Sequence, residues 1–243
     1  MIFGSILAGG TGARMDKHNI PKQFIDLCGK PVIIHTIERM LEIKEFEYLY
    51  IAIHPDYRDY LQNILKTFNL ADNQRIIIIN GGKERIDSVQ NVINAAYEFN
   101  HNENDIIVLH DAVRPFTSIE ILKDCINAAQ EYGATIATIP AVDTMLVSKD
   151  GKFLNEVPDR KTILHGQAPD GFRLGVLKKA IEELTPQERS YITGTAQICC
   201  VKGYPVKVIK GDVKNMKITV EQDLILAEKI YLQGVENQCT QAK

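Results

Sequence analysis

Residues 2–12 read IFGSILAGGTG, an apolar run of seven residues that passes directly into a cluster of glycines. A short run that is apolar on both faces is typical of strands in parallel sheets covered by helices on both sides. Glycines directly after such a strand let the backbone turn tightly and approach another group closely. The stretch therefore predicts the first strand of an α/β sheet, with a binding loop at its carboxyl end.

The chain repeats this alternation of short apolar runs and amphipathic segments. We expect strands at residues 2–8, 48–53, 75–79, 105–109, 134–140 and 206–210. We expect helices at residues 31–44, 56–68, 86–99, 118–132, 173–184 and 220–232. Alternation of this kind predicts a doubly wound, mostly parallel, Rossmann-like sheet. Ligands of such sheets bind where the carboxyl ends of the strands meet.

Residues 142–167 interrupt the alternation. Residues 144–148 and 152–157 alternate around a Lys-Asp-Gly turn, and Asp-Gly between alternating runs favours a β-hairpin. We expect a hairpin arm that projects from a single domain of residues 1–232. Projecting arms often serve as dimer contacts, so we also expect a homodimer. The polar residues 233–243 are expected to form a frayed tail.

Composition excludes several classes of protein. The 243 residues carry 28 Lys and Arg against 31 Asp and Glu, and this net charge of −3 is too balanced for a main partner that is a nucleic acid. No apolar run approaches the roughly 18 residues that a membrane-spanning helix needs. The five cysteines lack CxxC or metal-ligand spacing, which indicates reduced thiols. We expect a soluble, cytoplasmic protein without a membrane partner.

Residues 9–12 contain three glycines and form the first candidate site. Their backbone N–H groups are able to form a nest for an anion. Two common nucleotide-binding motifs do not fit the sequence. Gly10 occupies the position of the lysine in the P-loop motif, and Met15 occupies the position of the third glycine in the dinucleotide fingerprint. Arg14 and Lys22 are placed to reach the same phosphate groups. The alternative is that both are solvated surface cations.

Two further strand ends carry polar groups. Residues 81–88, GGKERIDS, combine glycines with basic residues where a helix begins, and helix N-termini suit phosphate, ribose or base edges. The alternative there is plain turn and capping chemistry. Residues 110–115 read HDAVRP, and Asp111 is placed to hold a divalent metal that bridges phosphate oxygens. The alternative for Asp111 is an ion pair with Arg114 that fixes the loop.

Taken together, these motifs resemble the cytidylyltransferases that act on methylerythritol phosphate or ribitol 5-phosphate. The similarity covers residues 2–230, and its motifs follow the family's order. They are LAGGTGARM with PKQ, GGKERIDS, HDAVRP, the Val-Pro-Asp-Arg segment at 157–160 and NMKIT at 215–219. LAGGTG, HTIE, HGQ-x-P-x-x-F and the V-K-G patterns around Val201 and Lys210 are similar to the ribitol 5-phosphate branch.

The resemblance implies a role for each matching residue. The residues that would line the CTP site are Leu7, Ala8, Gly9, Gly10, Gly82, Arg85, Ser88 and Ala112. Arg14 and Lys22 would neutralise charge on the α-phosphate and the departing pyrophosphate, and Asp111 would hold Mg²⁺. Arg160, on the arm, and Lys217 would position the acceptor phosphate, with Arg160 acting across a dimer. Asp212 and Asn215 are candidates for a second metal ligand.

The implied reaction transfers CMP from CTP to an alditol phosphate and releases pyrophosphate. D-ribitol 5-phosphate is the first candidate acceptor, giving CDP-ribitol for teichoic acid or capsule. The alternatives are 2-C-methyl-D-erythritol 4-phosphate in isoprenoid synthesis and the phosphates of arabinitol, mannitol or glycerol. A nucleotide-binding regulator is the non-enzymatic alternative. A phosphate monoester is already anionic near neutral pH, so the reaction needs no general base and we assign no catalytic histidine.

The acceptor half departs from the family pattern. Family members read Gln-Thr-Pro-Gln or Leu-Thr-Pro-Gln where this chain has Gln-Ala-Pro-Asp at 167–170, and Thr-Asp where it has Thr-Gly at 193–194. Ala168 lacks a hydroxyl and Gly194 lacks a carboxylate. We expect a site with these changes to discriminate differently among polyols.

Overall fold

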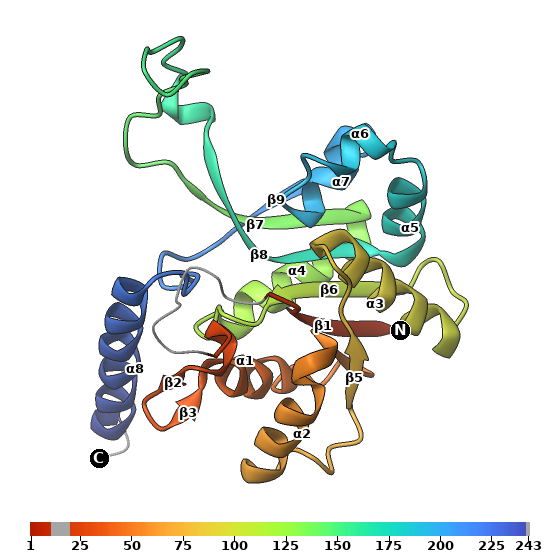
Figure 1. Ribbon diagram of the computed structural model, residues 1–243, viewed down its shortest axis with the longest axis vertical. Coiled ribbons are helices and arrows are strands. Elements are labelled where there is room, and N and C mark those ends of the chain that lie inside the picture. Colours follow the sequence, from red (N-terminus) through yellow and green to blue (C-terminus); the bar gives the residue numbers. More distant parts are fainter. Residues whose placement is uncertain (11–19, 242–243) are drawn as a thin grey trace.

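The computed structural model describes residues 1–10 and 20–241, and the core of this part is one seven-stranded sheet in the order β5-β4-β1-β6-β8-β7-β9 (Figure 1). The strands are β1 (Ile2–Ala8), β4 (Leu49–Ile53), β5 (Ile76–Asn80), β6 (Ile106–Asp111), β7 (Ala134–Pro140), β8 (Leu164–Arg173) and β9 (Lys207–Lys210). All pairings are parallel except those of β8 with β6 and β7. The prediction of a mostly parallel α/β sheet is confirmed.

Helices cover both faces of this sheet. One face carries α1 (Val32–Leu41), α2 (Arg58–Thr67) and α4 (Ile119–Tyr132). The other carries α3 (Arg85–Phe99), α5 (Leu174–Glu182) and α7 (Thr195–Val201). The short α6 (Pro186–Arg189) precedes α7, and α8 (Glu221–Gln241) packs beside the small hairpin of β2 (Asp26–Leu27) and β3 (Lys30–Pro31) (Figure 1). Within the described ranges, no helix is both long enough and apolar enough to cross a bilayer.

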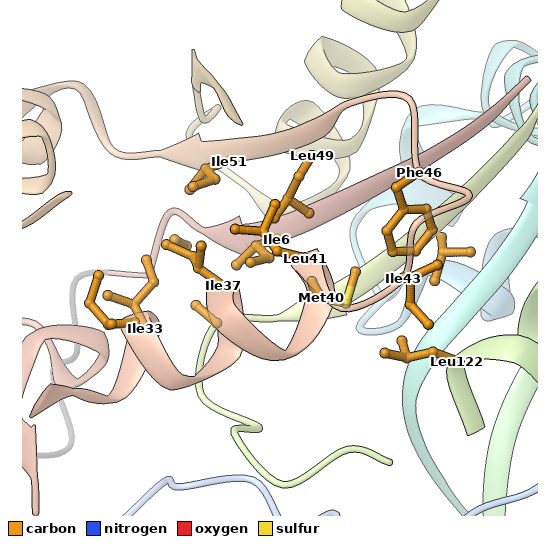
Figure 2. Packing of buried hydrophobic residues seen from close by; sticks show 14 of the residues in the cluster. Ile6, Ile33, Ile37, Met40, Leu41, Ile43, Phe46, Leu49, Ile51 and Leu122 are labelled. Atoms are coloured by element: carbon orange, nitrogen blue, oxygen red, sulfur yellow. The ribbon is translucent and has the colours of Figure 1, made fainter. Parts of the chain in front are cut away.

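Alternate side chains of the central strands enter opposite cores. Ile6, Leu49 and Ile51 face α1, and Figure 2 shows them beside the helix face that carries Ile33 and Ile37. Phe3, Tyr50 and Ile107 enter the core on the other side of the sheet. Burying one such side chain stabilises the fold by roughly 1.5–3 kcal/mol. Because both faces are packed in this way, the ends of the central strands are held in fixed positions.

The order of the strands creates a crevice at one edge of the sheet. β1 lies between β4 and β6, so the chain leaves β1 toward one side and later returns on the other. At such a switch point the loops that follow the strands diverge and leave room for a ligand. The glycine loop after β1, the turn after β5 and Asp111 at the end of β6 all lie at this edge.

The arm projects beyond the sheet between β7 and β8 (Figure 1), but its tip differs from the predicted hairpin. Residues 164–167, which we assigned to the arm, belong to β8. Across the arm, which the structure describes throughout, Val147 and Glu156 form one isolated bridge instead of two paired strands. The Asp150 carboxylate accepts the N–H groups of Lys152 and Phe153 at 2.9 and 3.0 Å. Such local bonds compete with a strand ladder, and an isolated two-stranded ribbon is marginal in water.

Four other elements, β8, α6, α7 and the end of α8, differ from the prediction. The sequence did not indicate β8, because Gly166, Pro169 and Gly171 are residue types depleted in strands. It did not indicate α6 and α7, which are only four and seven residues long. We expected residues 233–243 to be a frayed tail, and the structure continues α8 as far as Gln241. Extending a helix that already exists adds one hydrogen bond for each residue fixed, and this segment contains no proline.

We expect Gly171→Ala to lower the free energy of unfolding by about 1–3 kcal/mol, the usual cost of overpacking a core. A Cβ at this position of β8 would lie 2.7 Å from Cys125 Sγ and 3.0 Å from the Cys125 carbonyl oxygen. The matched control is Gly194→Ala, because a Cβ there meets no atom within 4 Å and its backbone is extended. Urea titrations of both variants provide the measurement, and equal stabilities would contradict the proposed packing of β8.

Candidate active site

The loops after β1, β5 and β6 enclose a cavity of about 230 Å³, which we call the nucleotide cavity. It brings together residues that are far apart in the sequence. All eight residues expected at the CTP site line this cavity: Leu7, Ala8, Gly9, Gly10, Gly82, Arg85, Ser88 and Ala112. The charged residues Lys22, Asp111 and Lys217 line the same cavity. The three strand ends thus form one site.

Two of the predicted residues are not among the described residues that line this cavity. Arg14 lies outside the described residues. Arg160 lies on the arm in the 3₁₀ turn η4 (Arg160–Thr162), where its side chain is exposed and its Nη1 donates to the Val142 carbonyl oxygen at 2.6 Å. It therefore does not line the nucleotide cavity of its own chain.

A buried glutamine fixes the glycine loop. Gln23, in the 3₁₀ turn η2 (Lys22–Phe24), is 2% exposed, and its Nε2 donates to the carbonyl oxygens of Ala8 and Gly10 at 2.9 and 3.0 Å. These bonds use the carbonyl oxygens of Ala8 and Gly10 and not their N–H groups. This glutamine belongs to the PKQ motif, but its role was not predicted from the sequence. Its only signal was an amide side chain next to a proposed phosphate-binding lysine.

The second glycine loop is fixed by Ser88. The Gly82 N–H donates to Ser88 Oγ at 3.0 Å, and that hydroxyl donates to the Glu84 carbonyl oxygen at 3.2 Å. A Cβ on Gly82 would lie 2.0 Å from Cβ of Asp87, so only glycine fits. Glu84 and Asp87 form a capping box at the start of α3, so plain capping chemistry is also present in this loop.

Asp111 is the centre of the charged groups. Its Oδ1 accepts from Arg85 Nη1 at 2.8 Å, and its Oδ2 lies 3.2 Å from Arg114 Nε and 3.0 Å from Lys217 Nζ. Burial alone would raise the pKa of Asp111, but Arg85, Lys217 and Arg114 together hold this pKa well below its ordinary value. The pair with Arg114 therefore exists, and the carboxylate also lines the cavity.

A magnesium ion at this site would share Asp111 with Arg85, Arg114 and Lys217, which already bind both of its carboxylate oxygens. Within the described ranges, His, Cys, Asp and Glu do not gather in a group of three that would hold a metal by themselves. Mg²⁺ at nucleotide sites is usually held by one or two carboxylates together with phosphate oxygens and waters. Asp111 supplies one such hard oxygen donor at the cavity wall. Asp212 and Asn215, considered as second ligands, do not line this cavity.

A second cavity of about 270 Å³, the acceptor cavity, adjoins the first. The two cavities share Arg85, Asp111 and Lys217 as lining residues. Beyond this cluster the acceptor cavity is lined by Arg114, Gln167, Ala168, Asp170, Thr193 and Gly194. Molecules bound in the two cavities would therefore meet at the shared charges.

Hydrogen bonds between distant segments position the loop that carries Lys217. Asn215 Nδ2 donates to the Ala168 carbonyl oxygen at 2.6 Å, and Arg114 Nη1 donates to the Asn215 carbonyl oxygen at 2.7 Å. Gln167 Nε2 donates to the Asp212 carbonyl oxygen at 2.9 Å. The loop is thereby attached both to β8 and to Arg114, which pairs with Asp111.

Two buried titratable groups adjoin the charged cluster. Burial lowers the pKa of His110 to about 4, so this histidine is neutral near pH 7. Asp170, on β8, is 4% exposed, and burial raises its pKa to about 7 although Arg85 opposes the shift. The Asp170 carboxyl accepts a hydrogen bond from the Ala196 N–H at the start of α7.

The chain is similar to known proteins over almost its full length. The family model of 2-C-methyl-D-erythritol 4-phosphate cytidylyltransferase (IspD) matches residues 2–233. The structure of 4-diphosphocytidyl-2C-methyl-D-erythritol synthase from Anaerococcus prevotii is 26% identical, with a TM-score of 0.78 over 96% of each chain. The Francisella tularensis 2-C-methyl-D-erythritol 4-phosphate cytidylyltransferase is 26% identical, with a TM-score of 0.75 over 93% of this chain and 98% of that one. The enzyme from Thermus thermophilus, at 24% identity, shares the fold with a TM-score of 0.72 over 95% of this chain and 98% of that one.

A mostly parallel sheet of this topology, with basic side chains and glycine loops meeting at its strand ends, is that of a nucleotidyltransferase. The chain belongs to the 2-C-methyl-D-erythritol 4-phosphate cytidylyltransferase family, whose model matches nearly all of it. It is a cytidylyltransferase that uses CTP.

We expect Asp170→Asn to stabilise the protein more at high pH than at low pH. The folded-state pKa of about 7 lies above the ordinary value of 3.8, so ionisation of Asp170 opposes folding. Protonated Asp170 favours the folded state of the native protein. The native protein should lose this stabilisation as the pH rises through about 7, whereas the variant has no carboxyl to ionise and should not. The increase in the free energy of unfolding caused by the substitution should itself grow by about 2–3 kcal/mol between about pH 5 and pH 8. Urea unfolding of both proteins across this range measures it, and a gain independent of pH would contradict the raised pKa.

Proposed function

We propose that this cytidylyltransferase transfers CMP from CTP to D-ribitol 5-phosphate, releasing pyrophosphate and forming CDP-ribitol for a teichoic acid or capsule polymer. The observation that carries the proposal is that the nucleotide cavity and the acceptor cavity share Arg85, Asp111 and Lys217. Two polyanions, CTP and an alditol phosphate, would then meet where the positive side chains are concentrated.

The reaction needs positioning and charge stabilisation more than proton transfer. An oxygen of the acceptor phosphate attacks the α-phosphorus of CTP, and the bond from this phosphorus to the bridging oxygen of pyrophosphate breaks. The attacking oxygen is already anionic, so no base removes a proton. Bringing the two polyanions together and stabilising the charge of the transition state are the main tasks of such a site.

Each residue has a defined task in this proposal. The N–H groups of Gly9 and Gly10 donate to phosphate oxygens, and Lys22 and Arg14 neutralise the α-phosphate and the departing pyrophosphate. Lys217 holds the acceptor phosphate beside them. Asp111 would hold Mg²⁺, and a bound ion would supply further neutralisation of phosphate charge. These positively charged groups are fixed in advance, so they need little reorganisation during the reaction.

The choice of ribitol over methylerythritol rests on the acceptor half of the chain. The named relatives act on methylerythritol phosphate, and this favours that acceptor as the second candidate. At 26% identity, however, residues around an acceptor often differ. Here Ala168 offers no hydroxyl and Gly194 no side chain to the acceptor cavity. The HTIE and HGQ-x-P-x-x-F motifs are similar to the ribitol 5-phosphate branch.

Pyrophosphate release with CTP, Mg²⁺ and a panel of acceptors tests the proposal. We expect faster turnover with ribitol 5-phosphate than with 2-C-methyl-D-erythritol 4-phosphate or with arabinitol, mannitol or glycerol phosphates. Lys22→Ala should lower kcat about a hundredfold, as expected for the loss of one preorganised charge contact. Faster turnover of methylerythritol phosphate would assign the second candidate. Tight CTP binding without turnover of any acceptor would favour a regulatory protein.

We also propose that the arm forms a homodimer and that Arg160 completes the acceptor site of the partner subunit. Arg160 is exposed and does not line the acceptor cavity of its own chain. The arm also exposes the apolar side chains of Val142, Phe153, Leu154 and Val157, which are 58–75% accessible. Apolar side chains gathered in this way mark interaction surfaces. A second copy of the chain would cover them and receive the arginine.

A mixture of two inactive variants distinguishes action across the dimer from action within one chain. In a heterodimer of Arg160→Ala and Lys22→Ala, action across the dimer leaves one site with both residues and the other with neither. Random mixing should therefore restore about a quarter of the native kcat in a symmetric dimer. The matched control mixes each variant with itself and should remain inactive. If Arg160 acts within its own chain, the heterodimer should recover no activity.

A further inference from the structure

The inner wall of the acceptor cavity carries a buried carboxyl that the proposed mechanism does not use. Asp170 lies on β8 opposite Leu109 of β6 and Ile136 of β7, lines the acceptor cavity and is 4% exposed. The Ala196 N–H at the start of α7 is a hydrogen-bond donor to it. A carboxyl offers up to four acceptor positions, and the Ala196 N–H occupies one of them. A buried polar group of this kind needs further partners, and a bound ligand is able to supply them.

The loop opposite this carboxyl leaves room for a ligand. Gly194, just before α7, also lines the acceptor cavity, and a Cβ on it would meet no atom within 4 Å. Its φ of −133° is one that any residue adopts, so neither packing nor backbone conformation requires glycine there. The missing side chain therefore enlarges the cavity beside Thr193 and Asp170.

The position of the acceptor phosphate sets the direction of the rest of the acceptor. In the proposed function, which this inference deepens and on which it rests, the phosphate attacks CTP and must lie at the cluster shared by the two cavities. The carbon chain then extends away from Lys217 toward Asp170 and Gly194. The hydroxyl groups of the polyol would reach the remaining acceptor positions of the carboxyl.

We propose that Asp170 determines acceptor specificity by accepting hydrogen bonds from the hydroxyl groups of a linear polyol phosphate whose chain occupies the space left by Gly194. A short acceptor does not reach this carboxyl. An acceptor that placed a methyl group against it would bury a polar group without a hydrogen bond. Sites built to bond a hydroxyl reject analogues that lack it.

A cycle of two enzymes and two acceptors tests this inference. The enzymes are the native protein and Asp170→Asn, and the acceptors are a linear pentitol 5-phosphate and glycerol 3-phosphate. The pentitol phosphate is whichever of ribitol 5-phosphate and arabinitol 5-phosphate the native enzyme uses faster. We expect Asp170→Asn to lower kcat/KM about 10- to 100-fold for the pentitol phosphate, as for a lost hydrogen bond to a charged group, and to leave glycerol 3-phosphate nearly unchanged. The KM for CTP should not change, and Asp124→Asn, an exposed carboxyl on α4, should behave as the native protein.

Gly194→Val is an independent second variant, because it fills the space without altering the carboxyl. It should raise KM for the pentitol phosphate at least tenfold and leave glycerol 3-phosphate nearly unchanged. If the native enzyme turned over a pentitol phosphate while both variants lost kcat/KM equally with the two acceptors, that result would overturn this inference alone. Turnover of methylerythritol phosphate and of no linear polyol phosphate would overturn the proposed function and this inference with it.

Discussion

The site depends on one carboxylate, Asp111, at the end of the central strand β6. Arg85, Arg114 and Lys217 come from three separate segments, and each lies within 3.2 Å of an Asp111 oxygen. Without this carboxylate, three positive charges would face one another in a partly buried cavity. Removing one partner of a buried ion pair typically destabilises a protein by about 3–5 kcal/mol, because the remaining charge has no compensation. Asp111 thus holds the cations in position before a phosphate arrives.

This arrangement links folding to catalysis through the sheet. β6 is buried between β1 and β8, so the position of Asp111 is set by packing on both faces. Arg85 begins α3 directly after the second glycine loop, and the Lys217 loop is attached to β8 through Asn215. The charges are therefore fixed by rigid elements. Charges that are preorganised in this way are what the proposed mechanism requires.

The sequence predicted those parts of the fold that local patterns determine. The bounds of β1 and β7 were predicted to the residue, since apolar β-branched runs between helices are a strong signal. The glycine loops and Asp111 were found because each lies directly after such a run. β8 was not found, because its glycines and Pro169 are tolerated only through neighbours distant in sequence. The bonds from Gln23 to the glycine loop and from Asn215 to Ala168 join segments 13–47 residues apart, and no local pattern indicates them.

The two halves of the site differ in the same way, since one is built from local motifs and the other from contacts between distant segments. The nucleotide cavity is built largely from backbone groups and short motifs, each of which lies in one segment of the chain. The inner part of the acceptor cavity is built from β8 and the loop before α7, which meet only in the folded protein. Ala168, Asp170 and Gly194 line this cavity and not the nucleotide cavity that contains Lys22 and the glycine loops. The family fold is therefore able to keep one nucleotide chemistry while the acceptor changes, and the acceptor has to be inferred from β8 and that loop.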